Sequence, residues 1–404
     1  MVGTSSTAAS PAARSDPTVV AREVGRTIEP YAAAHDHDGT FVQEGYAAVR
    51  AAGLPLLCVP AELGGWGASL GDAVAVHAEL ARWCPSTSLA FAMHTHAVLT
   101  NAWRWRRGWD GSTRLLRAVA DDGVVLATSG TSDLLRVSTR AVATNDGWRV
   151  NGRRRFVSGA PGADWLVSAA LVDDPDGPMP LSFAVPFRRG GVEIVDTWDA
   201  LGMRGTGSHD VVLRDVHVGH EEGRSWRVVP TAGAGATSDR RNRGVTRRIP
   251  VIGLLHSMPV LAAVYWGTAR AARDRAVALV ADMPRAGDPA IRRSIGSMDA
   301  QLRASWWSLE GFVRDVGNDP EPTEARYLDA MLAKRHVVLA AGEVTDLALD
   351  VVGGSSYYRR LPLERAYRDV RAAKTHPLTP EATLAALGDF ALRLAAPRPG
   401  PGFP

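Results

Sequence analysis

Four histidines are the side chains in this sequence best suited to moving a proton. His94 and His96 lie two positions apart in one apolar stretch, His256 lies in another, and His376 directly precedes Pro377. Imidazole titrates near neutral pH, so a positioned histidine can donate and then accept a proton. No pair of histidines or carboxylates has a spacing that suits a metal. The pattern therefore favours acid–base chemistry, with ordinary packing as the alternative for each ring.

The neighbouring residues indicate which of these histidines is best placed for an acid–base role. Residues two apart on a helix point to different faces, so at most one of His94 and His96 is expected to be functional, with His94 slightly preferred. The residue before a proline avoids helical backbone, which favours a turn that holds the His376 side chain in place. We therefore take His376 as the leading candidate for an acid–base role.

Residues 156–159 form a run that could hold a flat ring. Phe156 and Ser158 alternate with Val157 along a predicted strand, so they share one face. An aromatic side chain can cover a ring, and a neighbouring hydroxyl can hydrogen-bond the polar edge of that ring. The alternative is an ordinary strand with an inward phenylalanine. Gly353 and Gly354 allow close backbone approach to a phosphate-bearing ligand, or else end a helix.

The elements that position these residues fall into three blocks. Residues 17–122 show helical periodicity, residues 123–220 read as short strands between turn signals, and residues 249–396 are helical again. Residues 221–248 are a connection rich in Gly, Arg and Ser. Residues 1–16 are expected to be a disordered leader and residues 397–404 a frayed tail. Segregated helical and strand blocks predict an α+β fold.

Composition narrows the class of protein. The chain has 404 residues, a net charge of +3, 46% hydrophobic residues and two cysteines, Cys58 and Cys84, which predicts a cytoplasmic protein with reduced thiols. No apolar run is read as long enough to span a bilayer, and no secretory signal is seen. The single basic cluster, within residues 240–248, is interpreted as a solvated loop and not as a nucleic-acid site.

Three stretches together resemble the acyl-CoA dehydrogenase superfamily of flavoproteins. They are VPAELGGWGASLGDAVAVHAELAR near the N-terminus, the β block with SGTSD, FVSGAPGADW and LGMRGTGSHD, and DVVGGSSYYRRLPLERAYRDVR near the C-terminus. The resemblance covers residues 18–392. It implies an N-terminal helical domain, a central β-barrel-like domain and a C-terminal four-helix bundle, with the flavin between the last two. It also implies a homo-oligomer, either a tetramer or a dimer of dimers.

Carried over residue by residue, the resemblance implies a set of flavin-binding positions. The cofactor is FMN or FAD, and the sequence leaves that choice open. The implied positions are Phe156, Val157, Ser158, Ser132, Gly353, Gly354 and Arg368.

The sequence departs from the dehydrogenases where those enzymes carry their carboxylate base. The usual position of the glutamate falls on Pro377, and a second position used by some members falls near His256, again without a carboxylate. The Arg-x-x-Phe-Gly segment that grips the pyrophosphate of FAD is absent after Met283. The chain resembles the scaffold of the superfamily without its dehydrogenation base.

The flavin-dependent monooxygenase branch, which includes enzymes similar to dibenzothiophene monooxygenase, fits better. Its pattern is matched by Arg368-Asp369-Val370-Arg371 with His376, by Ser158, and by His94 or His96. The resemblance implies that reduced flavin from a separate reductase and O2 act on a small organic substrate. The absence of a nicotinamide-binding GxGxxG agrees with a partner reductase. Two alternatives stay open: an acyl-CoA or acyl-carrier-protein dehydrogenase with a relocated base, and a catalytically silent binding protein.

Overall fold

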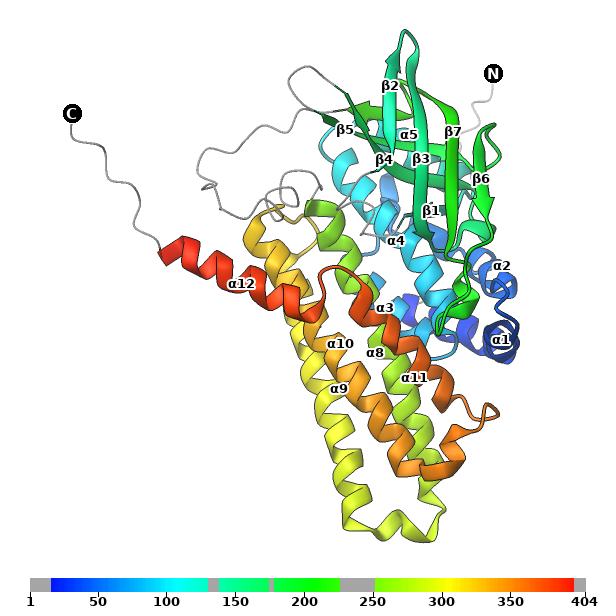
Figure 1. The fold of residues 1–404 in the computed structure, drawn as a ribbon, viewed down its shortest axis with the longest axis vertical. Helices are drawn as coiled ribbons and strands as arrows, with labels where there is room; N and C mark the ends of the chain where they lie inside the picture. The colour runs from blue at the N-terminus through cyan, green and yellow to red at the C-terminus, as the bar shows by residue number, and fades with distance from the viewer. Residues whose placement is uncertain (1–15, 130–137, 174–177, 226–250, 396–404) are drawn as a thin grey trace, which may run out of the picture.

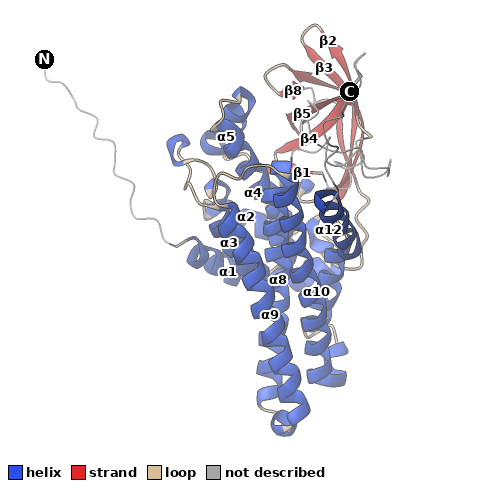
Figure 2. Ribbon diagram, turned by 90° about the vertical axis from the view of Figure 1, so that its left-hand side faces the viewer, coloured by secondary structure: helices blue, strands red, loops and turns tan. Residues whose placement is uncertain are grey.

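The structure is a computed structural model that describes residues 16–129, 138–173, 178–225 and 251–395. The predicted flavin contact Ser132, the basic cluster within residues 240–248 and both chain ends lie outside these ranges. Figures 1 and 2 show the described part as a long helical body with a sheet at one end.

The N-terminal helices are set by local capping signals. Ser69 caps α3 in a reciprocal pair with Asp72, as a capping box should, and Pro85 takes the first turn of α4, where a missing N–H costs nothing. Gly39 and Gly123 end α1 and α5 in left-handed backbone. The helices are α1 (Pro17–Asp38), α2 (Gln43–Ala51), α3 (Leu70–Ala81), α4 (Pro85–Trp105) and α5 (Asp110–Asp122).

Eight strands form one mixed sheet in the order β6-β7-β3-β2-β4-β5-β8, and β1 adds to β4 in parallel. The β3–β7 ladder changes register between Arg154 and Val157, at the end of β3 that faces the helices. The strands are β1 (Leu126–Thr128), β2 (Arg140–Thr144), β3 (Gly147–Val157), β4 (Trp165–Val172), β5 (Met179–Pro186), β6 (Val192–Val195), β7 (His209–Gly219) and β8 (Gly223–Ser225).

Three long antiparallel helices dominate the C-terminal part, and α11 packs against two of them, α8 and α10. α12 extends away from the other helices in Figure 1. α8 is long and apolar enough to cross a membrane, but 83% of its most apolar window is buried inside the protein, as in a core helix. The helices are α8 (Val251–Ala281), α9 (Pro289–Val316), α10 (Glu324–Val352), α11 (Leu363–Arg371) and α12 (Pro380–Ala395).

Two hydrophobic cores divide the molecule. One runs without interruption through the N-terminal and C-terminal helices, so these two blocks share a core although the sheet separates them in the sequence. The other lies within the sheet and includes Val157 and Phe183. The predicted α+β class, with helical, strand and helical blocks in that order, is confirmed.

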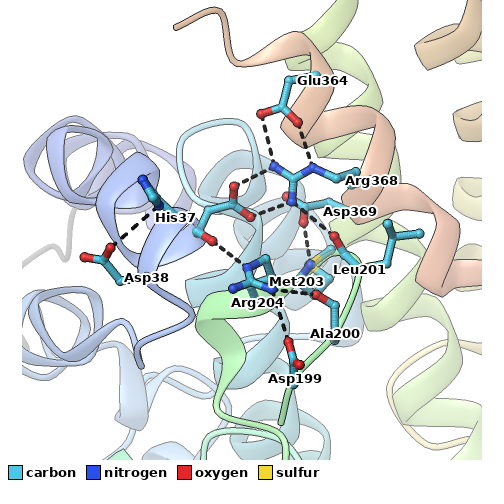
Figure 3. Close-up of polar contacts among 11 residues, drawn as sticks. His37, Asp38, Asp199, Ala200, Leu201, Met203, Arg204, Glu364, Arg368 and Asp369 are labelled. Atoms are coloured by element: carbon cyan, nitrogen blue, oxygen red, sulfur yellow. Dashed lines mark hydrogen bonds and ion pairs between the residues drawn. The ribbon is translucent and has the colours of Figure 1, made fainter. Parts of the chain in front are cut away.

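A polar junction ties three segments of the chain together (Figure 3). Arg368 on α11 donates to both carboxylate oxygens of Asp36 on α1, at 2.9 and 2.6 Å, and to Glu364 one turn earlier on α11. It also donates to the carbonyl of Leu201, in the segment between β6 and β7. Arg204 of that segment donates to the Asp36 carbonyl at 2.7 Å. Shared partners therefore fix α1, α11 and the segment relative to one another.

The next residue on α11, Asp369, holds the same segment from the inside. Its Oδ1 accepts a hydrogen bond from the backbone N–H of Met203 at 2.5 Å, and its side chain is almost fully buried. Burial raises the pKa of the Asp369 carboxyl to about 7. Met203 has left-handed backbone, with φ of 53°, so this hydrogen bond stabilises a conformation that methionine rarely adopts.

We expect Asp369→Leu to lower the free energy of unfolding by about 1–3 kcal/mol, because it leaves the buried Met203 N–H without an acceptor. Asp369→Asn keeps an oxygen at that position and should stay close to wild type. Urea denaturation of the two variants measures the difference. The control is Asp199→Asn, an exposed partner in the same network, for which we expect a change within about 0.5 kcal/mol. A leucine variant as stable as the asparagine variant would contradict the role of this hydrogen bond.

Candidate active site

A cavity of about 360 Å³ lies between the sheet and the helices α4 and α8. One face of α4 lines it along most of the length of the helix, from Leu89 to Arg104, which spans about 22 Å at 1.5 Å per residue. The opposite walls come from β1, β3, β4, β5, α8 and the turn that follows α11. Among the described residues that line the cavity, none is Asp or Glu.

Two aromatic rings form one wall of this cavity. Phe156, at the end of β3, meets Trp198 edge to face with ring centroids 6.1 Å apart, and 49% of Phe156 is exposed. Phe156 has φ of 55°, which accompanies the change of register at this point of the β3–β7 ladder. Phe156 and Ser158 both line the cavity, whereas Val157 is fully buried in the core of the sheet. The aromatic ring and the hydroxyl therefore face one space.

A chain of hydroxyls gives Ser158 a defined polarity. Thr206 Oγ1 donates to the Met203 carbonyl at 2.9 Å, so it accepts from Ser208 at 2.7 Å, and Ser208 in turn accepts from Ser158 at 2.7 Å. With its proton committed to Ser208, Ser158 Oγ has lone pairs left to accept a hydrogen bond from a ligand. Because the chain ends on Met203, the Asp369 junction also positions this acceptor.

Ser129, at the end of β1, has the opposite polarity. Its Oγ accepts from Nε and Nη2 of the fully buried Arg154, at 3.2 and 2.7 Å. These two bonds occupy its lone pairs and leave the hydroxyl proton for another acceptor. Ser129 lines the cavity, so the site combines a hydroxyl acceptor at Ser158 with a hydroxyl donor at Ser129.

His376 lies on the turn after α11 and lines the cavity, as its sequence position suggested. Its Nε2 lies 2.6 Å from the hydroxyl of the buried Tyr265 on α8. Burial raises the pKa of Tyr265 and, with the nearby charge of Lys334, lowers the pKa of His376 to about 4. At neutral pH the tyrosine therefore donates and the neutral imidazole accepts. This bond fixes the tautomer and leaves Nδ1–H as the free donor of His376.

His96 is the second histidine in the cavity wall. Thr128 Oγ1 lies 3.1 Å from His96 Nε2 and 3.3 Å from the sulfur of Met93, which is a weak acceptor, so this hydroxyl pairs with Nε2 in either tautomer of the ring. Burial lowers the pKa of His96 to about 4, which keeps the ring neutral at neutral pH. His96 and His376 therefore line one cavity as neutral rings.

The other two histidines do not line the cavity. His94 donates from Nε2 to the carbonyl of Pro55 at 2.9 Å and accepts at Nδ1 from the backbone N–H of Leu126 at 3.1 Å, so both ring nitrogens are satisfied by main-chain groups. His256 pairs with Thr100 at 3.1 Å behind the cavity wall. The geometry reverses the slight preference for His94 over His96, because α4 turns His96 and not His94 toward the cavity.

The other predicted flavin contacts lie apart from this cavity. Arg368 is occupied by Asp36 and Glu364 in the junction described above. Gly353, with φ of 72°, ends α10 beside Arg285, and Gly354 directly follows it. This end of α10 lies at the end of the bundle distant from the sheet in Figure 1. The structure also adds residues to the site that sequence reasoning missed: Trp198, Tyr265, Ser129 and Arg104.

Comparison with known proteins identifies the class of protein. Three acyl-CoA dehydrogenase domain models match in order: the N-terminal domain at residues 18–105, the middle domain at 128–216 and the C-terminal domain at 259–381. The chain belongs to the acyl-CoA dehydrogenase family. The resemblance seen in the sequence is confirmed, and with it the class of flavin-dependent oxidoreductases.

Several individual relatives are named nitrososynthases or monooxygenases, and one, from Bacillus subtilis, is named a putative acyl-CoA dehydrogenase and is 28% identical over 90% of this chain and 93% of that protein. The chain is 32% identical to L-evernosamine nitrososynthase of a Micromonospora species, over 90% of this chain and 86% of that protein. It is 28% identical to dibenzothiophene monooxygenase of Mycolicibacterium goodii, over 95% of each chain. KijD3, in complex with FMN and dTDP-3-amino-2,3,6-trideoxy-4-keto-3-methyl-D-glucose, superposes with a TM-score of 0.81 at 27% identity, over 96% of each chain.

Buried histidines make the stability of this protein sensitive to acid. Burial lowers the pKa of five of them from about 6.5 to about 3 or about 4, so the unfolded chain binds more protons than the folded one in this window. Stability is then fully present above pH 6.5 and falls as the pH drops toward 4. The raised pKa of Asp369 acts in the opposite direction, but it is one group against five. Three of these histidines, His77, His94 and His256, are buried, and the other two, His96 and His376, are partly exposed to the cavity.

We expect the Tm to fall steadily between pH 7 and pH 4.5, because each unit of lowered histidine pKa corresponds to about 1.4 kcal/mol. Scanning calorimetry at several pH values and constant ionic strength measures this dependence. A Tm that stays level over the range would show that these rings are not neutral and buried in the folded protein.

Proposed function

We propose that this protein is a flavin-dependent monooxygenase that takes reduced FMN from a separate reductase and uses O2 to oxygenate a small organic substrate. The observation that carries the proposal is the make-up of the cavity wall. It combines two neutral histidines and two hydroxyls with aromatic and apolar side chains, and no described lining residue is a carboxylate. Pro377, which takes the place of the base of the dehydrogenases, lines the same cavity.

The cavity suits an isoalloxazine ring. Phe156 and Trp198 offer flat apolar surfaces, Ser158 offers an acceptor for a ring N–H, and Ser129 offers a donor for a ring carbonyl. When bound, reduced flavin supplies the electrons that activate O2. We propose that these four residues hold the ring in place.

The two histidines have separate proton roles in this proposal. His376 presents Nδ1–H as a donor toward oxygen bound in the cavity, and Tyr265 keeps that proton on Nδ1. His96, a neutral ring in the same wall, accepts a proton released by the substrate. Leu89, Ala97, Leu254 and Leu261 line the cavity between the polar groups and exclude water, which otherwise competes for every hydrogen bond made there.

The relatives support the choice of an oxygenase and of FMN. Nitrososynthase and dibenzothiophene monooxygenase are the names of two relatives, and KijD3 is a structural relative described with FMN. We also propose a homo-oligomer, because α12 leaves Leu384, Leu392 and Leu394 between 49% and 73% exposed, a surface that a second copy could cover.

The reaction is tested by mixing the protein with FMN, a flavin reductase, NADH and ¹⁸O2, and by offering a dTDP-linked amino sugar and dibenzothiophene as first substrates. We expect ¹⁸O in a product, formed only when the reductase is present. The competing dehydrogenase function predicts instead that an acyl-CoA bleaches bound oxidised flavin without O2. Bleaching by acyl-CoA, or the lack of any flavin binding, would contradict the proposal.

We expect His376→Ala to lower the yield of oxygenated product about 100-fold or more, as loss of a positioned proton donor does. Tyr265→Phe leaves His376 in place but removes the hydroxyl that fixes the tautomer of its ring. The loss of oxygenated product should therefore be smaller in this variant. In both variants the electrons should appear as hydrogen peroxide, and peroxide release per NADH measures this. The control is His336→Ala, an exposed histidine on α10. A His376→Ala variant with unchanged coupling would remove His376 from the mechanism.

A further inference from the structure

The cavity ends at a buried cation that the proposed reaction does not use. Arg104 lies in the last turn of α4, eight residues beyond His96, which places it about 12 Å further along the helix axis. It lines the cavity, and only 9% of the residue is exposed. Its position on the same helical face as His96 and Thr100 turns it into the space that the histidines share.

Arg104 has no counter-ion in the described part of the chain. No hydrogen bond or ion pair is formed by its guanidinium there, and its Nε is buried without a partner. Its one specific contact is with the face of Trp109, 5.3 Å from the ring centroid. By contrast, Arg107 one turn on pairs with Asp319 at 2.7 Å. The same helix end therefore neutralises an exposed arginine and leaves a buried one unpaired.

A second cation contacts the same tryptophan as Arg104, although it is exposed and does not line the cavity. Arg224 on β8 lies 5.0 Å from the centroid of the Trp109 ring and forms no ion pair among the described residues. Elsewhere in the cavity wall, the buried hydroxyl of Ser168 on β4 has no partner among the described residues. Ser182 on β5, cross-strand from Arg224, lines the cavity as well.

Burial of an unpaired guanidinium is unfavourable, because the charge loses water and gains no partner. Desolvation lowers the pKa of Arg104 to about 10, which still leaves it charged at neutral pH. An arginine in this state costs stability in the empty protein, and a ligand that brings a negative group would compensate that cost. Its forked donors suit a phosphate or a carboxylate.

We infer that this end of the cavity is a subsite for an anionic group of the substrate, with Arg104 as its anchor. The inference rests on the proposed function, because it assigns a charge to the substrate of that site. It narrows the substrate to a small organic molecule that carries a phosphate, diphosphate or carboxylate away from the atom that is oxygenated.

The phosphate of FMN is the other possible source of such an anion, and the geometry favours the substrate. Ser158 lies near the start of α4, since a Cβ built on the adjacent Gly159 would lie 3.3 Å from the Ala90 carbonyl oxygen. Ala90 and Arg104 are about 21 Å apart along the helix. Arg104 is thus separated by most of a helix from Ser158, the acceptor proposed for a ring N–H.

The first experiment measures anion binding without turnover. Inorganic pyrophosphate and benzoate are titrated calorimetrically into the full-length protein, into Arg104→Gln and into the control Arg106→Gln, which changes an exposed arginine outside the cavity. We expect at least one anion to bind wild type and the control alike. We expect Arg104→Gln to weaken that binding about tenfold or more, as loss of a charge-assisted hydrogen bond does. Failure of both anions to bind wild type, or equal binding by all three proteins, would overturn the inference.

The second experiment separates the two sources of the anion. The dissociation constants of FMN and of riboflavin, which lacks the phosphate, are compared in wild type and in Arg104→Gln. A substrate subsite predicts the same FMN-to-riboflavin ratio in both proteins. A ratio that collapses in the variant would assign Arg104 to the flavin phosphate and overturn the inference. Flavin binding in wild type reports on the proposed function separately, so the two can fail independently.

The Tm of the ligand-free protein tests whether Arg104 serves only the stability of the fold. Because Arg104 is unpaired, replacing it with a neutral side chain should leave the Tm of the ligand-free protein unchanged or raise it. A marked fall in Tm for Arg104→Gln, but not for Arg106→Gln, would show that the guanidinium serves the fold and would count against the subsite.

Discussion

The hydrogen bond from the Met203 N–H to the buried carboxyl of Asp369 is the constraint on which the rest of the site depends. It holds the segment between β6 and β7 against α11, and Arg368 ties the same point to α1. From Met203 the hydroxyl chain runs through Thr206 and Ser208 to Ser158. A contact between α11 and a segment far from it in the sequence thereby decides where a hydroxyl lies on the opposite wall of the cavity.

Desolvation is the second constraint, because it keeps the histidines of the cavity neutral and thereby limits the hydrogen bonds that each ring can make. The cavity lies between two hydrophobic cores, so its histidines stay neutral at the pH where free histidine begins to charge. A neutral imidazole has one donor and one acceptor, and a single neighbour decides which nitrogen carries the proton. Tyr265 makes that choice for His376. The unpaired Arg104 brings the one charge that this face of α4 leaves to a ligand.

Sequence patterns predicted the parts of this arrangement that are local. Strand alternation placed Phe156 and Ser158 on one face, and both line the cavity. Helical spacing showed that His94 and His96 diverge, but not which one faces the cavity, because the phase of α4 is set by its packing against β1 and α8. Trp198 lies on an irregular segment, which has no periodicity to place its ring.

Long-range partners explain the other differences. Arg368 has the residue type and motif of an anion-binding group, but its anion is Asp36, 332 positions away in the chain. No local pattern reveals that pairing. Arg104 lies in an arginine-rich helix end. Composition cannot show that Arg107 pairs with Asp319 whereas Arg104 does not. Charge compensation is a property of the packed molecule, and only coordinates display it.

The central claim is that a flavin ring lies in this cavity with its polar edge at Ser158 and no carboxylate within reach of the substrate. A crystal structure of the protein soaked with FMN tests it most directly. The account predicts electron density for the ring against the wall formed by Phe156 and Trp198, within hydrogen-bonding distance of Ser158, with His376 and His96 on the substrate side. Density for the ring elsewhere, or an Asp or Glu carboxylate in contact with the open face of the ring, would contradict it.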